Sequence, residues 1–195
     1  LKQRLLSQSV IHGDETTVQV LKEKDRKATD ESYIWAYRSG QDSLEPVVLL
    51  EYQPGRGQVH PQTFLGDYRG ILMSDGYQAW RTLKGATHVG CMAHARRRFV
   101  NAFKAGKKQS GRPAQALKFF DQLYRIERQV RDEKPDDGET RADCIRRLRQ
   151  KHSVPVLDAL KEWLDRMVPK VVPDTKLGDA ISCPTSAPMR QNWFN

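Results

Sequence analysis

The chain has 195 residues, of which 38% are hydrophobic and 29% charged, a composition that excludes a protein disordered throughout and allows a sizeable core. Its net charge of +9 predicts a polyanionic partner, with nucleic acid favoured over an anionic membrane surface. No apolar run approaches the roughly 18 residues of a membrane span. Three cysteines far apart in the sequence favour a reduced, cytoplasmic setting over a disulfide framework.

The first half of the chain predicts three strands in succession. Residues 10–21, 32–39 and 46–52 carry strand patterns and are separated by a charged stretch and a turn. Short connections between strands favour an antiparallel meander. Within residues 32–39 we expect the aromatic side chains to share one face. Residues 46–52 are nearly all apolar, so we expect that strand to be central and covered on both faces.

Two shorter strands then alternate with helices. A short helix through Phe64 and Tyr68 precedes a strand at 71–75, and a second short helix within 76–85 precedes a strand at 87–91. Strands that follow helices favour parallel additions to a sheet. The fold class predicted is therefore α/β, with a mixed five-stranded sheet, flanking helices and a helical segment after it.

The second half of the chain predicts helices. Amphipathic or basic stretches cover 93–104, 114–131 and 139–151, and a further helix follows Ser153 with Pro155 in its first turn. The predicted organisation is a core at 8–110, a helical lobe at 111–181 and a tail at 182–195.

Two aspartates stand where the predicted strands could meet. Asp14 lies in the first strand, on the same side as Val18 and Val20, which we expect to be the core side. Asp75 ends the fourth strand and precedes Gly76, which permits a sharp turn. If the two strands are neighbours, the carboxylates repel unless a cation lies between them.

Magnesium suits such a pair because it prefers oxygen ligands and is often held by only one or two protein carboxylates. Two such ions support phosphodiester chemistry, and Mn²⁺ can substitute for Mg²⁺. The alternative reading is that Asp14 is a strand-entry residue and Asp75 an ordinary turn residue before glycine.

A long segment after Asp75 contains no acidic residue. Between residues 76 and 120 there is no Asp or Glu, while ten lysines and arginines occur there. We predict DNA phosphate contacts from part of this block; the candidates are His94, Arg96, Arg97, Arg98, Lys104, Lys107 and Lys108. The three consecutive arginines fan across about 200° of a helix, so they cannot all face one row of phosphates. A solvated helix face is the alternative.

Cys91 and His94 have the spacing of half a zinc site, although no second tight pair accompanies them. A buried cysteine followed by a histidine at the start of a helix is the simpler interpretation. His94 could also contact phosphate or the two carboxylates.

Several segments together resemble one known family. "GDETTVQVL", "YIWAYRS", "VVLLEYQPGRG", "FLGDYRGILMSDGYQAW", "HVGCMAHARRRFVNAFKA", "LYRIERQVR" and "LDALKEWLDRM" follow one another in the order seen in the insertion sequence sixty-six family of bacterial transposases. The resemblance covers roughly residues 8–181, and "SDGY" with "C-x-A-H-A-R-R-x-F" are its most specific motifs.

The resemblance implies a ribonuclease-H-like fold with a D-D-E catalytic core. Such enzymes use Mg²⁺ to hydrolyse a phosphodiester at a transposon end and then join the freed 3′-hydroxyl to target DNA. By motif match, Asp14 resembles the first carboxylate and Asp75 the second, and Arg96, Arg97 and Arg98 match the basic run. The implied partners are transposon-end and target DNA, and an active enzyme is expected to be a homo-oligomer.

The chain departs from the family pattern near its C-terminus. The family places its third acid in an "N-N-x-x-E-R" stretch before a closing "R-K-N-W". Here "LGDAI" at 177–181 is followed by "SCPTSAPMRQNWFN", in which "RQNW" resembles the closing motif and no acid occurs. The resemblance thus implies a truncated copy with an internal deletion, and the initial leucine fits a fragment of a longer protein.

Three functions stay open from the sequence. The first is a Mg²⁺-dependent transposase core, and the second is a remnant that binds DNA without cutting it. The third is a nuclease of the same fold that recruits Glu127 or Glu162 as a substitute acid; the simpler interpretation of both glutamates is that they are solvated.

Overall fold

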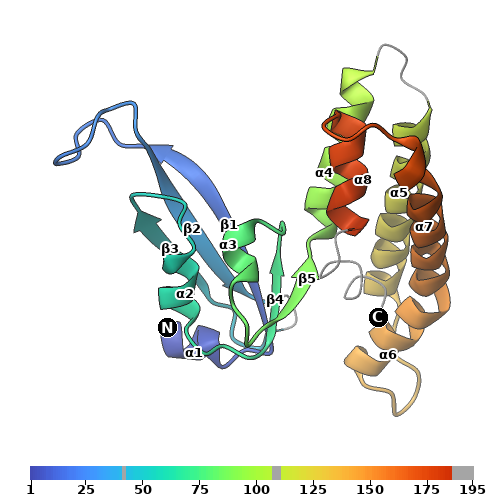
Figure 1. Ribbon diagram of the computed structural model, residues 1–195. Helices are drawn as coiled ribbons and strands as arrows, with labels where there is room; N and C mark the ends of the chain where they lie inside the picture. The colour runs from blue at the N-terminus through green and yellow to red at the C-terminus, as the bar shows by residue number, and fades with distance from the viewer. Residues whose placement is uncertain (41–42, 107–110, 186–195) are drawn as a thin grey trace. The chain divides into compact units, whose positions relative to one another are not determined.

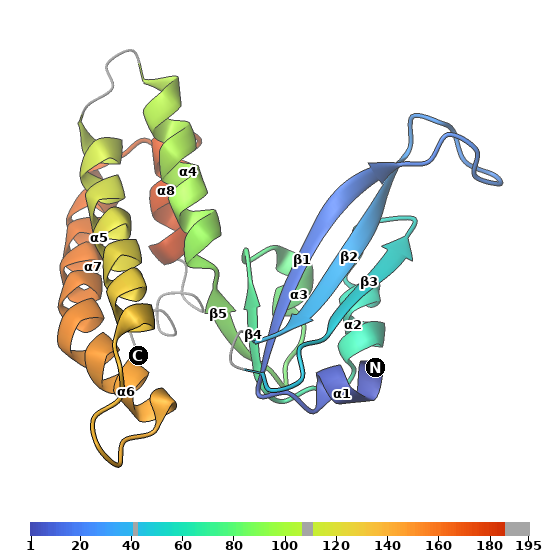
Figure 2. The ribbon, with the colours of Figure 1, turned by 180° about the vertical axis from the view of Figure 1, so that it is seen from behind.

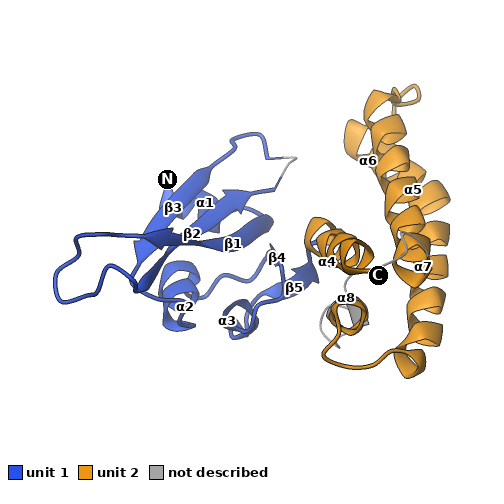
Figure 3. Ribbon diagram, turned by 90° about the horizontal axis from the view of Figure 1, so that it is seen from above, with its two compact units in different colours: residues 1–91 blue, residues 92–195 orange. Residues whose placement is uncertain are grey.

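The computed structural model describes residues 1–40, 43–106 and 111–185 (Figure 1). Two compact units make up the chain, residues 1–91 as unit 1 and residues 92–195 as unit 2 (Figure 3). Unit 1 contains α1 (Lys2–Leu6), β1 (Val10–Gln19), β2 (Glu31–Ser39), β3 (Val48–Gln53), α2 (Val59–Leu65), β4 (Ile71–Ser74), α3 (Gln78–Arg81) and β5 (Thr87–Gly90).

Unit 1 is built on a mixed five-stranded sheet with the order β3-β2-β1-β4-β5. The pairs β1–β2 and β2–β3 are antiparallel, which confirms the predicted meander. The pairs β1–β4 and β4–β5 are parallel, which confirms that strands after helices are added in parallel. The connection from the meander therefore returns to the far side of β1 and places β4 beside it.

The core of unit 1 lies between this sheet and the helices α2 and α3, which cover one of its faces (Figures 1 and 2). The predicted shared face of β2 is confirmed, because Trp35 and Tyr37 are fully buried and Tyr33 packs against the same core. Tyr37 stacks on Phe64 with ring centroids 3.7 Å apart. The ring of Trp80 meets Trp35 edge-on at 5.1 Å. Helix and sheet are thus joined through aromatic rings.

The expectation that residues 46–52 form a central strand was wrong. β3 is an edge strand, paired only with β2 in the sheet order. Val48 and Leu50 are 61% and 68% exposed, and Tyr52 is 42% exposed. These side chains alternate with Leu49 and Glu51 and lie on the sheet face opposite α2 and α3. The apolar run at 46–52 therefore corresponds to an edge strand with one exposed face, not to a strand buried on both faces.

Unit 2 is helical and contains α4 (Met92–Ala105), α5 (Arg112–Asp132), α6 (Arg141–Leu148), a π-helical turn (Arg149–Ser153), α7 (Val154–Met167), a 3₁₀ turn (Val168–Lys170) and α8 (Lys176–Thr185). Phe99 of α4 lies 5.7 Å from Phe120 of α5 and 6.1 Å from Trp163 of α7, measured between ring centroids. These rings tie three helices into one core.

Two features of unit 2 differ from the sequence-based organisation. Helix α4, which we placed with the sheet, falls within unit 2 and packs on α5 and α8. Helix α8 was not predicted, although Ala180 and Ile181 in it are buried. It takes in the first residues of the tail predicted at 182–195, and the rest of that tail lies outside the described residues. No helix in the described part of the chain is long and apolar enough to cross a bilayer.

Candidate functional site

The register of β1 and β4 brings the two candidate aspartates to the same level. The last paired residues are His12 and Met73. Continuing this register by two residues sets Asp14 opposite Asp75, which is the first residue after β4. Because side chains alternate along a strand, Asp14 lies on the face that carries His12. Asp75 lies in the turn beyond β4, so this alternation does not extend to its side chain. The backbone of Asp14 and that of Asp75 are therefore neighbours where β4 ends.

The face of β1 that carries Asp14 is not the core side, so this part of the sequence reading was wrong. The covered face of β1 carries Ile11, which is fully buried, and Gly13. Asp14 is exposed and lies on the opposite face. The carboxylate thus does not interrupt an apolar surface, and it stays accessible to a ligand from solution.

Asp75 is held in a tight turn after β4. Gly76 adopts a φ of 84°, the left-handed region that glycine tolerates, as the sequence predicted. Its N–H donates to Ser74 Oγ at 3.2 Å, and the N–H of Tyr77 donates to Asp75 Oδ1 at 2.8 Å. The turn therefore fixes one oxygen of Asp75 through the backbone.

His12 shares the face of Asp14, two residues earlier on β1. Burial and the positive charge of Arg38, which is its partner in β2, lower the pKa of His12. A lowered pKa favours the neutral imidazole. His12 therefore adds no permanent positive charge to the surface where Asp14 lies.

The donor set of Asp14 and Asp75 fits a hard divalent cation. A carboxylate from β1 and one from the turn after β4 supply oxygen ligands and leave the remaining positions to water or phosphate oxygens, which is how Mg²⁺ is commonly held. Within the described residues, no group of three or more His, Cys, Asp or Glu side chains could hold a metal ion. The cation site and the half zinc site at Cys91 and His94 stay predictions.

The residues that the sequence reading missed lie behind Asp14, on the covered face of β1. Glu15 Oε2 accepts a hydrogen bond from Trp80 Nε1 at 2.7 Å. Its Oε1 accepts Arg56 Nε at 2.9 Å and also forms an ion pair with the terminal nitrogen of Arg56. Burial raises the pKa of Glu15, while the hydrogen bonds from Arg56 and Trp80 oppose that shift. The sequence signal that could have pointed to Glu15 is its position inside a β-strand, where acidic residues are disfavoured.

Those predicted DNA-binding residues that the structure describes lie on α4 in unit 2 and differ in exposure. Arg97, Arg98 and Lys104 are exposed, whereas His94 is half-buried. Arg96 is also half-buried, donates to Asp121 at 3.1 Å and lies 5.9 Å from the ring of Tyr124. The three consecutive arginines thus point in different directions around the helix, as expected, and two of them face solvent.

Lys107 and Lys108 lie outside the described residues, so the basic surface on α4 consists of Arg97, Arg98 and Lys104. This surface belongs to unit 2, whereas the two aspartates belong to unit 1.

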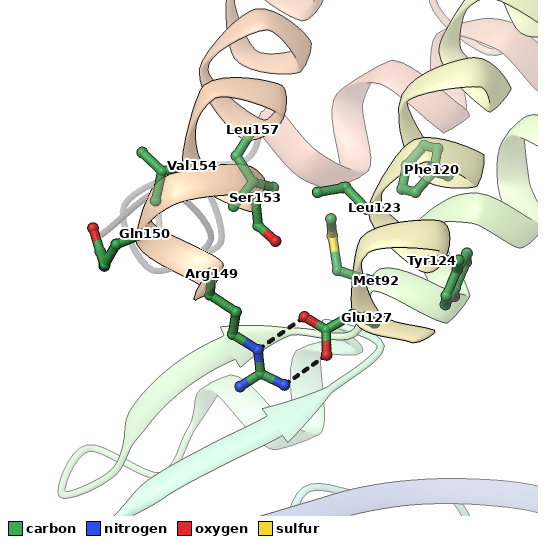
Figure 4. Close-up of a pocket in the computed structure, with 10 residues that line it drawn as sticks. All are labelled: Met92, Phe120, Leu123, Tyr124, Glu127, Arg149, Gln150, Ser153, Val154 and Leu157. Carbon is green, nitrogen blue, oxygen red and sulfur yellow. Dashed lines mark hydrogen bonds and ion pairs between the residues drawn. The ribbon is translucent and has the colours of Figure 1, made fainter. Parts of the chain in front are cut away.

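A cavity of about 340 Å³ opens between α5, the π-helical turn and α7 (Figure 4). Its lining is mainly apolar and includes Met92, Phe120, Leu123, Val154 and Leu157. At its edge both oxygens of Glu127 accept hydrogen bonds from Arg149, at 2.8 and 2.7 Å. Glu127, one suggested substitute acid, is therefore engaged in a two-point ion pair. Glu162, the other, is exposed on α7.

Comparison with known proteins gives a family match over almost the whole chain. The model of the family described as "Transposase IS66 family" matches residues 1–188. Among curated proteins, y4hP of Sinorhizobium fredii is 30% identical over 177 residues, covering 80% of this chain and 30% of the relative. Proteins y4qI and y4jD of the same organism are each 29% identical, covering 88% and 90% of this chain.

The chain spans about a third of the length of these curated relatives, each of which is described as an uncharacterized protein. No solved structure matches the chain.

Proposed function

The chain belongs to the IS66 family of transposases, and from that premise we propose that unit 1 is the ribonuclease-H-like catalytic unit of a DNA transposase. The strand order β3-β2-β1-β4-β5, with two antiparallel pairs followed by two parallel pairs, supports this fold assignment. The observation that carries the function is the parallel pairing of β1 with β4, whose register, continued by two residues, sets Asp14 level with Asp75.

In this proposal Asp14 and Asp75 hold divalent magnesium. When bound, the cation supplies Lewis-acid activation of a water or 3′-hydroxyl and neutralises charge on the phosphodiester. The protein's own contribution is to present Asp14 on the open face of the sheet and Asp75 in the turn beside it, where a DNA backbone can approach. The turn at Gly76 and the N–H of Tyr77 orient the carboxylate of Asp75 for that task.

The basic surface on α4 supports DNA as the partner. Arg97, Arg98 and Lys104 are exposed, and the chain carries a net charge of +9, so it attracts phosphate. Transposon ends and target DNA are the substrates proposed for a complete transposase, which we propose acts as a homo-oligomer.

Binding of Mn²⁺ tests the cation site directly. Electron paramagnetic resonance of Mn²⁺ reports free ion, so its loss on adding the chain measures binding. We expect Asp14→Asn and Asp75→Asn each to weaken the affinity by more than about tenfold. Asp67→Asn is the matched control, because Asp67 is exposed in the same unit and the variant removes the same charge. Unchanged affinity in both site variants contradicts the assignment.

A second candidate function is DNA binding without cleavage. It is favoured by the finding that the described residues contain no group of three or more His, Cys, Asp or Glu side chains that could hold a metal ion. Incubation with supercoiled plasmid and Mn²⁺ separates the two functions. Nicking that disappears in Asp14→Asn and Asp75→Asn supports the catalytic unit. Salt-steep DNA binding with intact plasmid supports the second function.

A further inference from the structure

Glu15 is a buried carboxylate with an unusual set of partners. Its side chain is only 1% exposed, although it is adjacent in sequence to the exposed Asp14. One of its oxygens accepts Trp80 Nε1, and the other is bound by two nitrogens of Arg56. A buried charge is costly unless it is paired and hydrogen-bonded, and both conditions are met here. The loop between β3 and α2, which carries Arg56, is thereby tied to β1.

From Arg56 a chain of contacts leads to Asp75. The guanidinium lies 3.7 Å from the centroid of the Tyr77 ring, a close cation–π contact. The hydroxyl of Tyr77 donates to the backbone carbonyl of Arg56 at 2.9 Å. The backbone N–H of Tyr77 donates to Asp75 Oδ1 at 2.8 Å. Glu15, Arg56, Tyr77 and Asp75 are therefore linked by successive direct contacts.

The same chain of contacts has an electrostatic consequence. Arg56 is a permanent cation, and a positive charge close to Asp75 opposes the approach of a divalent cation to that carboxylate. Glu15 supplies the opposite charge in direct contact with the guanidinium. As long as the pair of Glu15 and Arg56 is intact, its net charge is zero. The N–H of Tyr77 then orients Asp75 without an uncompensated positive charge nearby that opposes the cation.

We propose that Glu15 is a positioning residue for the cation site: it holds Arg56 in place and neutralises its charge, so that the guanidinium near Asp75 does not weaken the cation affinity of Asp14 and Asp75. The proposal rests on the function proposed above, since it concerns the same cation. It adds a third acid to the site that acts without touching the metal.

The test is Mn²⁺ affinity in four chains: wild type, Glu15→Gln, Arg56→Gln and the double variant. Glu15→Gln leaves Arg56 charged beside Asp75, so we expect the affinity to fall by about tenfold or more. Neutralising residue 56 as well removes that charge, so the double variant recovers most of the affinity. Arg56→Gln alone is expected to bind Mn²⁺ at least as tightly as wild type.

Glu45→Gln is the matched control. Glu45 belongs to unit 1 and pairs with Arg4 at 2.9 Å, but both side chains are more than half exposed. The variant takes the same charge from the chain, so an unchanged affinity shows that net charge alone does not explain the weaker binding of Glu15→Gln. Thermal melts by circular dichroism establish that each variant is folded at the temperature of the titration.

The outcomes separate this proposal from the one on which it rests. Wild type that binds no Mn²⁺ overturns both. Wild type that binds, with Glu15→Gln binding equally well, overturns only the role of Glu15. A double variant that binds no better than Glu15→Gln also overturns it, because a purely structural contact is not restored by removing its second partner. If Glu15→Gln does not fold, weakened binding in Arg56→Gln alone serves as the contradicting result.

Discussion

The backbone at Gly13 lies directly against the ring of Trp80. A Cβ atom built on Gly13 would come within 2.6 Å of Cζ3 and 2.7 Å of Cη2 of that ring. The ring has no room to retreat, because Trp80 is fully buried and lies against Trp35 and Tyr37. Three consecutive residues of β1 thus have different surroundings: Gly13 leaves room for the ring of Trp80, Asp14 faces solvent, and Glu15 accepts a hydrogen bond from the Trp80 indole.

Gly13→Ala is therefore expected to destabilise the protein by about 1–3 kcal/mol, the usual cost of overpacking a core. Urea denaturation followed by tryptophan fluorescence measures the change. Gly57→Ala is the control, since a Cβ there would have its nearest neighbour at 3.8 Å. We expect that variant to be neutral or more stable by up to about 1 kcal/mol. Equal stability of the two variants would contradict the close approach of Trp80.

Trp80→Phe tests the hydrogen bond to Glu15. The phenyl ring keeps most of the apolar contact but offers no N–H, so Glu15 Oε2 loses its donor. Leaving a buried acceptor without its partner costs about 1–3 kcal/mol, measurable by urea denaturation. In the background of Glu15→Gln, the same Trp80→Phe change is expected to cost less. Identical costs in the two backgrounds would show that the two side chains are not coupled.

Much of the sheet could be predicted because its signals are local. The alternation of aromatic residues predicted which face of β2 is buried, and the short connections predicted that the first three strands form an antiparallel meander. The neighbour relation of β1 and β4 followed from one assumption about the crossover, and the register then aligned Asp14 with Asp75. The sharp turn at Gly76 was predicted from the glycine that follows Asp75, and Gly76 adopts a positive φ there.

The rest depended on contacts between distant parts of the sequence. Glu15 and Arg56 are 41 residues apart, and no local pattern links an acid in a strand to an arginine in a loop. The exposure of β3 could not be read from its apolar run, because an open sheet face and a doubly covered strand give the same composition. The side of β1 that bears Asp14 was misjudged because Val18 and Val20 are only partly buried.

The three arginines of α4 are expected to differ in their effect on DNA binding. Arg97 and Arg98 are exposed, so replacing both with alanine should lower the salt slope of DNA binding by about one unit for each phosphate that is no longer neutralised. Arg96→Ala should leave the slope nearly unchanged, because Arg96 is held by Asp121. Fluorescence anisotropy of a labelled duplex between about 50 and 200 mM salt measures the slopes. Equal slopes for Arg96→Ala and the double variant would contradict the assignment.

The last prediction concerns stability in acid and the ion pair between Glu139 and Arg147. Both oxygens of Glu139 accept hydrogen bonds from Arg147 at 2.8 Å, and this interaction lowers the pKa of Glu139 from 4.5 to about 2. Because the folded-state pKa lies below the unfolded value, the contribution to stability is complete above pH 4.5 and is lost as pH falls toward 2. Urea denaturation of wild type over this range should show a decline that is shallower in Glu139→Gln. Arg147→Met, which removes the other partner, should show the same shallower decline, and a decline as steep as wild type in both variants would contradict the pairing.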